Sequence, residues 1–239
     1  PGIHKPQQQL GRILNKNAYT AMEDCDVIAW IIDCTQPFGR GDTFILERIK
    51  KLHKPTLLLL NKVDMLTKDE LMKACLAWQE QYNFDELIPI SALEKDNLDE
   101  LLRVFKAYLP EGLAMFPEEM KSDHDETFQM CEIVREKILK RTNQEIPHSI
   151  AVVLESRKED ENHMDLGMLV IVDKPSQKGI LIGKQAKMIR SIRLASQKEL
   201  SEKFHKKVHL DLYVRVEKNW RNQHEKIKEF GLDELDDND

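Results

Sequence analysis

The stretch Thr56-Leu-Leu-Leu-Leu-Asn-Lys-Val-Asp64 decides the fold of the first half of this 239-residue chain. Four consecutive leucines between polar residues are typical of a short strand that is buried on both faces of a parallel sheet. The polar motif Asn61-Lys62-Val63-Asp64 follows directly, at the carboxyl end of such a strand. Ligands of open α/β sheets bind at this edge, so the stretch predicts both a buried strand and a ligand-binding loop.

Apolar runs and helical patterns alternate around this strand. Residues 26–33 form a second apolar run, which predicts another strand buried on both faces, and residues 87–90 form a short third one. Helical periodicity is present in residues 10–22 and in the segments that begin after Thr67 and after Asn97, where the sequence is typical of capped helices. The order βαβαβα predicts a parallel sheet with helices on both faces.

Two strand ends carry groups that suit a guanine base. Asp64 can accept hydrogen bonds from the N1 and N2 donors of guanine, a donor pair that adenine lacks, while Asn61 and the stem of Lys62 brace the loop and the ring face. The segment Ser91-Ala92-Leu93 follows the strand at 87–90 and offers a backbone N–H to guanine O6. The alternative is that Asn61 and Asp64 are ordinary turn residues. The second motif at the next strand end favours the nucleotide site.

These two motifs resemble the base-recognition motifs of the GTPase superfamily, which implies GTP or GDP as ligand together with Mg²⁺. By the same resemblance, Pro1-Gly2 is the end of a D-x-x-G motif, and Gly2 is the glycine whose amide meets the γ-phosphate. Ile3 stands where Ras-like enzymes have a water-positioning Gln. The resemblance therefore indicates a subgroup that positions the attacking water by other means.

The phosphate-binding string G-x-x-x-x-G-K-[ST] does not occur in this sequence. The resemblance therefore places the phosphate-binding loop and the Asp linked to Mg²⁺ upstream of Pro1, so that the first domain is N-terminally incomplete here. No catalytic residue and no metal ligand is expected within the chain. Since phosphate contacts and Mg²⁺ supply most of the catalysis, we expect residues 1–239 alone not to hydrolyse GTP.

The second half has a different pattern. Residues 109–124 mix Pro, Gly and acidic residues and are typical of a linker. From about residue 126 the order is a helix, two strands (150–154 and 168–172), two helices around a Gly-containing loop, and an alternating strand at 208–216. This αββααβ order predicts a separate α+β domain at 125–222. Residues 223–239 are highly charged and predict a disordered tail.

Charge separates the two halves as well. The whole chain has a net charge of −6, which excludes a globally basic nucleic-acid binder. Residues 176–222, however, contain twelve basic and four acidic residues, a net charge of +8, which leaves −14 for the remainder. The alternative is a solvated helix face rich in Lys. A tight loop before a helix can bind a phosphate backbone, and this favours a nucleic-acid site.

The segment that begins at Ser176 resembles a type II KH domain, whose signature loop is G-x-x-G. Here the loop reads Gly183-Lys184-Gln185-Ala186, with Ala in place of the second Gly. If Ala186 is simply the first helical residue, the loss is small; if the position needs a positive φ, the grip on RNA is weakened. By this resemblance the RNA-binding residues are Lys178, Ile180, Gly183, Lys184, Gln185, Ala186, Lys187 and Arg190.

Taken together, the two halves resemble the Era family, bacterial GTPases with a C-terminal KH domain. The motifs that carry this resemblance run from PGIHKP at 1–6 through YLPEG at 108–112 and SQKGILIGKQ at 176–185 to NWRNQ at 219–223. The family implies a P-loop-type GTPase domain at 1–108 and a type II KH domain. It also implies a role in small-subunit maturation, with the KH domain on the 3′ end of small-subunit ribosomal RNA.

The implied partners are therefore this ribosomal RNA and the small ribosomal subunit. The expected location is the cytoplasm, with or without a peripheral contact to the inner face of the membrane, and the expected oligomeric state is a monomer. Two other functions stay open. One is a non-enzymatic RNA-binding protein with a degenerate GTPase domain, and the other is a fragment of a Der-type tandem GTPase.

Overall fold

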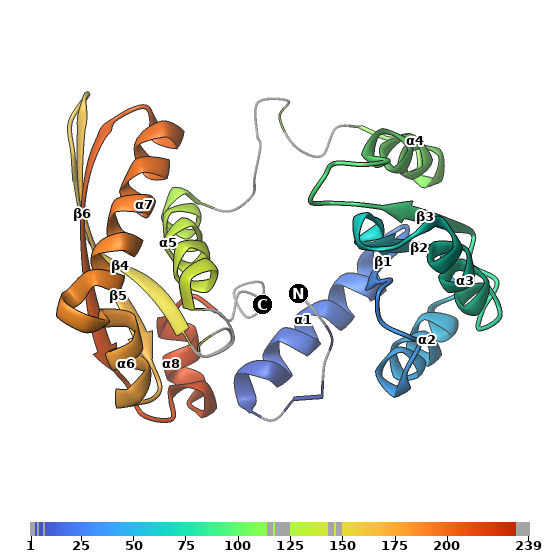
Figure 1. Cartoon of the computed structure of the whole chain (residues 1–239), viewed down its shortest axis with the longest axis horizontal. Coiled ribbons are helices and arrows are strands. Elements are labelled where there is room, and N and C mark those ends of the chain that lie inside the picture. Colours follow the sequence, from blue (N-terminus) through green and yellow to red (C-terminus); the bar gives the residue numbers. More distant parts are fainter. Residues whose placement is uncertain are drawn as a thin grey trace. The chain divides into compact units, whose positions relative to one another are not determined.

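The computed structural model describes residues 3, 5–6, 8–113, 117, 125–142, 146 and 150–232. The chain divides into two compact units. The first comprises Pro1–Lys5 and Leu14–Met115, and the second comprises Pro6–Ile13 and Phe116–Asp239. Each unit has a sheet and a hydrophobic core of its own, and the elements of each are labelled in Figure 1.

The first unit contains a parallel three-stranded sheet in the order β1 (Ile28–Asp33), β2 (Thr56–Asn61) and β3 (Glu86–Ile90). Parallel neighbours need crossover connections, which α2 (Arg40–Leu52) and α3 (Lys68–Gln79) supply. The four leucines of β2 are 2% exposed or less, so the middle strand is buried on both faces. The leucine run therefore predicted this strand correctly.

Helices cover both faces of this sheet. On one face, β1 and β2 pack against α2 and α3 in a cluster where the rings of Trp30 and Trp78 meet edge-on, with centroids 5.2 Å apart. On the other face, α4 (Leu98–Tyr108) packs against β2 and β3. The remaining helix, α1 (Gln9–Asp24), precedes β1. The predicted βαβαβα order of this unit is confirmed.

Two local predictions for this unit are wrong. Strand β1 is not buried on both faces, because its residues alternate and Ile31 is 59% exposed. The cluster under α4 is formed by β2 and β3 and does not extend over Ile31. The second error concerns Asn97, which adopts a left-handed conformation and gives α4 no side-chain cap. Its amide instead donates to the carbonyl of Pro89, which ties the helix start to β3.

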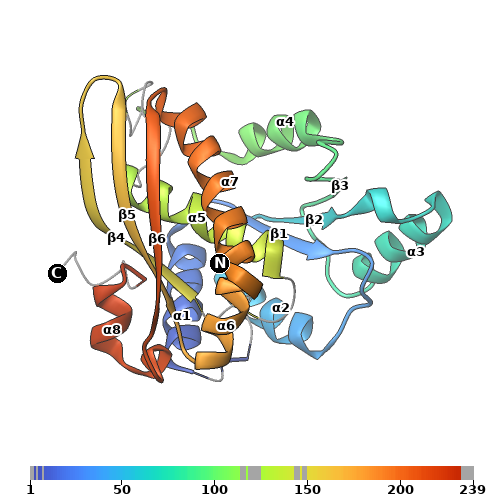
Figure 2. The same cartoon turned by 60° about the vertical axis from the view of Figure 1, so that its left-hand side comes forward.

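The second unit has the predicted αββααβ order. Helix α5 (Glu126–Thr142) precedes the antiparallel hairpin of β4 (Ile150–Glu159) and β5 (His163–Val172). Helices α6 (Pro175–Ile182) and α7 (Lys187–Phe204) then lead to β6 (Lys207–Val216), which pairs parallel with β5. Figure 2 shows the three strands side by side with β5 in the middle. Strand β5 begins at His163, five residues before the predicted start.

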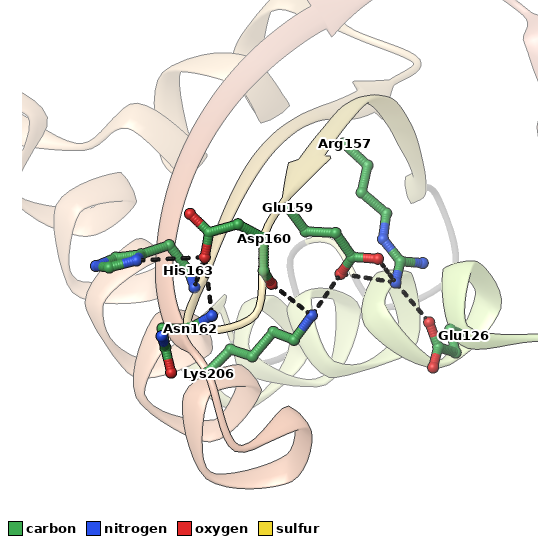
Figure 3. Close-up of polar contacts among 7 residues, drawn as sticks. All are labelled: Glu126, Arg157, Glu159, Asp160, Asn162, His163 and Lys206. Atoms are coloured by element: carbon green, nitrogen blue, oxygen red, sulfur yellow. Dashed lines mark hydrogen bonds and ion pairs between the residues drawn. The ribbon is translucent and has the colours of Figure 1, made fainter.

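A polar network ties the tip of the β4–β5 hairpin to its neighbours (Figure 3). Arg157 donates to Glu126 at the start of α5 at 2.6 Å and to Glu159 at 2.9 Å. Lys206, just before β6, donates to Glu159 at 3.3 Å and to the carbonyl of Asp160 at 2.9 Å. The Asp160 carboxylate in turn accepts from two backbone N–H groups of the hairpin turn. The hairpin tip is therefore held by charge as well as by the ladder.

The chain continues past β6 as folded structure, which corrects the prediction of a disordered tail from residue 223. A short turn η4 (Trp220–Asn222) leads to helix α8 (His224–Glu229). The side chains of Trp220 and Ile227 are fully buried, and the rings of Trp220 and Phe230 meet with centroids 5.5 Å apart. Apolar burial outweighs the high charge of this segment. Residues 233–239 lie outside the described part of the chain.

Two searches of the described residues bear on the function. No helix among them is long and apolar enough to cross a lipid bilayer. Nor do they contain a group of three or more His, Cys, Asp or Glu side chains arranged to hold a metal ion. The four cysteines are free thiols. Burial raises the pKa of Cys131 to about 11, so this thiol is a poor nucleophile.

Candidate functional site

The two base-recognition motifs lie at one edge of the first sheet. Asn61 ends β2 and pairs in register with Ile90, which ends β3. The residues after each strand, 62–64 and 91–93, therefore leave the sheet side by side. Parallel register makes this proximity unavoidable once β2 and β3 are neighbours, and it brings together the residues that the sequence assigned to a guanine base.

Hydrogen bonds join the two motifs directly. The hydroxyl of Ser91 donates to Asp64 Oδ1 at 2.5 Å, and the backbone N–H of Ala92 donates to Asn61 Oδ1 at 3.0 Å. Ser91 is fully buried, and its oxygen also accepts from the N–H of Glu94 at 3.1 Å. The carboxylate of Asp64 is therefore oriented before any ligand arrives, and such preorganisation saves the cost of ordering the loop on binding.

The exposed surface of this loop suits a flat base. Asp64 and Ala92 are exposed, and Leu93 is 80% exposed. A carboxylate held in place beside an exposed apolar side chain offers acceptors for adjacent ring donors and a surface for the ring face. The N–H of Ala92, a candidate donor to O6, is bonded to Asn61, so Asn61 fixes the position of the second loop.

Lys62 turns the chain between β2 and Asp64. Its backbone is left-handed, with φ 73° and ψ 34°, and a short 3-10 turn, η1 (Val63–Met65), follows. Its ammonium group donates to Asp33 Oδ2 at 2.6 Å. This contact raises the pKa of Lys62 and lowers the pKa of Asp33, because each charge stabilises the other. Asp33 was not among the predicted site residues, since only the β1–β2 register brings it here.

The remaining nucleotide prediction, Gly2, lies outside the described residues. Its neighbour Ile3 lines a pocket of about 600 Å³ against β1, α1 and α2. The pocket is mainly apolar, with Ile31, Trp30 and Trp78 in its wall, and it contains none of the residues of the base loop. It therefore does not mark the base site.

The loop between α6 and α7 in the second unit is built from unusual backbone conformations. Gly183 has φ 69° and ψ 174°, a region that only glycine occupies readily. Gln185 and Ala186 then adopt left-handed conformations, with φ 53° and φ 56°. Within the loop, the N–H of Ala186 donates to the Gly183 carbonyl at 3.2 Å. Together these angles turn the chain sharply from one helix into the next.

Ala186 is therefore not the first helical residue, and the position does require a positive φ. A left-handed residue with a Cβ costs about 1–2 kcal/mol. Ala186 is the N-cap of α7 and is exposed. The methyl group thus stands on the outer surface of the loop, where a bound backbone would approach. Of the two alternatives that the sequence left open, this is the one in which the substitution weakens the loop.

Basic side chains surround this loop. Lys184, Lys187 and Arg190 are exposed, and none of them forms an ion pair within the described part of the chain. Helix α7 also presents its N-terminus here, which favours bound phosphate. Free cations, a tight turn and a helix N-terminus form a surface suited to a single-stranded backbone.

Other predicted RNA-binding residues lie less openly. Gln185 is exposed at the tip of the loop, whereas Lys178 on α6 is partly buried. Ile180 packs against the hydrophobic core of the second unit, alongside buried residues such as Leu181. Ile180 therefore has a structural role whatever it contacts in a complex.

The NWRNQ motif anchors the loop from behind. Trp220 is fully buried, so it is a packing residue and not a base-stacking one. The neighbouring Arg221 donates to Asp173 at 3.1 Å, and Asp173 also accepts from the N–H of Asn219 at 2.5 Å. Asp173 lies between β5 and α6, so this contact fixes the start of the helix that leads into the RNA loop. Sequence reasoning missed Asp173, because its partner is 48 residues away.

Comparisons with known proteins agree with both sites. A model of the elongation factor Tu GTP-binding domain matches residues 14–111, and a model of the KH domain matches residues 145–221. A crystal structure of an Era variant from Aquifex aeolicus bound to GDP·AlF4⁻ is similar to this chain, with 34% identity and a TM-score of 0.91. The match covers 97% of this chain and 80% of that one. The chain belongs to the Era family.

A second Era structure matches equally well. It contains MgGDPNP and nucleotides 1506–1542 of 16S ribosomal RNA, and it too is 34% identical, with a TM-score of 0.91 and the same two coverages. The Era-family assignment confirms the GTPase and KH domains that the motifs predicted. This chain accordingly has the architecture of a GTPase joined to an RNA-binding module.

Proposed function

We propose that this chain binds guanine nucleotide through its first unit and ribosomal RNA through its second, and that it assists assembly of the small ribosomal subunit. The observation that carries the nucleotide part is the bonded pair of loops, in which Ser91 orients Asp64 and Asn61 holds Ala92. Era proteins have been crystallised with GDP·AlF4⁻ and with MgGDPNP, which supports GTP, GDP and Mg²⁺ as the ligands here.

In the proposed complex, the Asp64 carboxylate accepts from N1 and N2 of guanine. Lys62 and Leu93 border the ring, and Asn61 keeps the second loop at the correct distance. Mg²⁺ accompanies the phosphates and supplies charge neutralisation during phosphoryl transfer. The residues described here select and orient the base, so their substitution should alter nucleotide choice.

Base selection provides the test of this site. In the Asp64→Asn variant the side chain presents an amide donor to a ring position that in guanine is also a donor. Xanthine carries a carbonyl acceptor there, so we expect the variant to prefer XDP over GDP, measured by competition against a fluorescent nucleotide. If Asp64→Asn binds GDP as wild type does and gains no preference for XDP, the base-site assignment is wrong.

The RNA part of the proposal is supported by the free cations at the loop between α6 and α7. The proposed ligand is the 3′ end of small-subunit ribosomal RNA, because a related Era structure holds nucleotides 1506–1542 of 16S ribosomal RNA. In the proposed complex, Lys184 and Lys187 neutralise phosphates, while loop amides and the start of α7 donate to them. Bases of a single strand would then lie along the neighbouring surface.

Charge reversal tests this surface. Lys184→Glu together with Lys187→Glu should weaken binding of a single-stranded RNA from the 3′ end of 16S ribosomal RNA and should reduce the salt slope by about 1.5 to 2, since each lost phosphate contact removes one counterion-release step. Lys198→Glu, on the same helix but farther along it, is the matched control. Unchanged affinity and slope in the double variant would place the RNA elsewhere.

The proposed setting is the cytoplasm, as a monomer that associates with the small subunit and makes at most a peripheral membrane contact. Cell fractionation combined with sucrose-gradient sedimentation tests this. We expect the protein to comigrate with free small subunits and to leave them after high-salt washing. A protein found only in the membrane pellet, or only in large oligomers, would contradict the proposal.

A further inference from the structure

The end of β1 lies next to the base motif. Asp33 is the last residue of β1 and pairs in register with Asn61, the first residue of the motif. The N–H of Cys34 then donates to the Asn61 carbonyl at 3.0 Å, which continues the pairing beyond the strand ends. The carboxylate of Asp33 is thus placed by the sheet itself, at the level of Lys62.

Both oxygens of the Asp33 carboxylate are engaged. One of them, Oδ1, accepts from the N–H of Thr35 at 3.0 Å and from its hydroxyl at 2.6 Å. The other, Oδ2, accepts from Lys62 Nζ at 2.6 Å. The Thr35 contacts fix the rotamer of Asp33, and the remaining oxygen therefore meets Lys62 without loss of side-chain freedom on either binding or folding.

Lys62 needs such a partner. Its backbone is left-handed at φ 73°, a costly conformation for a residue with a Cβ. This turn carries the chain from β2 to Asp64, and the N–H of Met65 closes it by donating to the Lys62 carbonyl at 3.0 Å. A free Lys62 side chain would leave the turn to be held by backbone bonds alone.

We infer that Asp33 is a positioning residue of the guanine-base site, which holds Lys62 across the end of the sheet and thereby keeps the loop of Asn61 and Asp64 in its binding conformation. This inference rests on the proposed function and deepens it. Asp33 acts through Lys62 and not by contact with the base. Its contribution should therefore disappear when the Lys62 ammonium group is absent.

A double-mutant cycle on the full-length protein tests the inference. Asp33→Asn is nearly isosteric and keeps an oxygen for Thr35, while Lys62→Met keeps the apolar stem and removes the charge. The affinity for a fluorescent GDP analogue is measured for wild type, both single variants and the double variant. The matched control is Glu47→Gln, which removes another exposed ion pair of the same unit, with Lys50 at 2.9 Å.

We expect Asp33→Asn to weaken GDP binding about three- to tenfold in the wild-type background, the range for a partly exposed pair. It should change affinity less than twofold when Lys62 is already Met, and the control should leave affinity unchanged. The midpoint of thermal unfolding serves to separate this effect from a loss of folding. Equal effects of Asp33→Asn in both backgrounds, or no effect in either, would overturn the inference.

Failure of the proposed function would look different. A wild-type protein that binds GDP no better than ADP would refute guanine recognition itself, and the inference would fall with it. A wild-type protein that prefers GDP, with an Asp33→Asn variant that retains full affinity, would refute only the role of Asp33. If Asp33→Asn does not fold, a Lys62→Met variant with undiminished GDP affinity would equally refute the inference.

Discussion

Gly183 offers the sharpest test of the RNA loop, because a single methyl group should deform it. A Cβ added at Gly183 would lie 2.6 Å from the Cβ of Met188 and 3.1 Å from its backbone nitrogen. Neither of these atoms belongs to a flexible side-chain end, so the start of α7 would have to move. The substitution Gly183→Ala therefore attacks the turn at the point where α6 passes into α7.

The magnitude follows from two terms. The backbone angles of Gly183, φ 69° and ψ 174°, lie in a region that costs a non-glycine residue about 1–3 kcal/mol. Crowding against Met188 adds an overpacking term of about 1–3 kcal/mol, part of which is relieved if α7 shifts. We therefore expect Gly183→Ala to lower the free energy of unfolding of the second unit by about 2–4 kcal/mol.

Urea unfolding followed by circular dichroism measures this change, and binding of single-stranded RNA reports on the loop itself. The matched control is Gly179→Ala in the preceding helix, where a Cβ would have no neighbour within 4 Å. Helix propensity predicts that this control stabilises the protein by up to about 1 kcal/mol. If Gly183→Ala were within about 0.5 kcal/mol of the wild type, the assigned loop conformation would be wrong.

Three further predictions concern the same unit. Ala186→Gly should raise the unfolding free energy by about 0.5–1 kcal/mol and tighten RNA binding, because glycine relieves the left-handed strain; a destabilised variant would argue against that strain. Asp173→Ala should cost about 2–3 kcal/mol in urea, since it leaves Arg221 half-buried without its partner; unchanged stability would mean that the pair is not formed in solution. The pKa values of Glu159 and Asp160 are lowered, by Arg157 and by backbone N–H groups respectively, so their stabilising effect is present above about pH 4 and is lost as the pH falls through the folded-state pKa values. Urea midpoints measured from pH 7 to pH 2.5 should show this loss, and it should shrink when Arg157 is replaced by Met.

The strands and motifs that the sequence predicted are those with local causes. The leucine run of β2 is apolar on both faces because helices cover both, and no other element type accommodates it. The capping box of α3 was equally readable, since Thr67 and Glu70 bond each other across three residues. The base site followed from these elements, because the parallel order of the strands brings their carboxyl ends together.

The errors share a tertiary cause. Asn97 has the composition of a helix cap, but the carbonyl of Pro89 is within reach and takes its amide. Ile31 is apolar in a run that reads as buried, although only one side of β1 is covered by the described helices. The charge of residues 223–232 concealed Ile227 and Phe230, whose burial depends on Trp220. Each of these depends on a neighbour that composition does not identify.

The functional contacts that were missed are of the same kind. Asp33 and Lys62 are separated by 29 residues, and Asp173 and Arg221 by 48. Each pair is formed only after a particular strand pairing has been fixed. The sequence did contain a signal in both cases, namely an acidic residue directly after a buried strand. That signal becomes specific only when the neighbouring strand is known.

The parallel pairing of β5 with β6 has a consequence for the order of events during synthesis. The RNA loop lies inside the crossover between these two strands, so its two helices have no complete sheet to pack on until β6 has emerged and docked. Pairing across so long a connection is slow compared with forming a hairpin. A nascent chain shorter than about Val216 should therefore be unable to hold RNA, and the newly made protein acquires its ligand only after release of its last strand from the ribosomal exit tunnel.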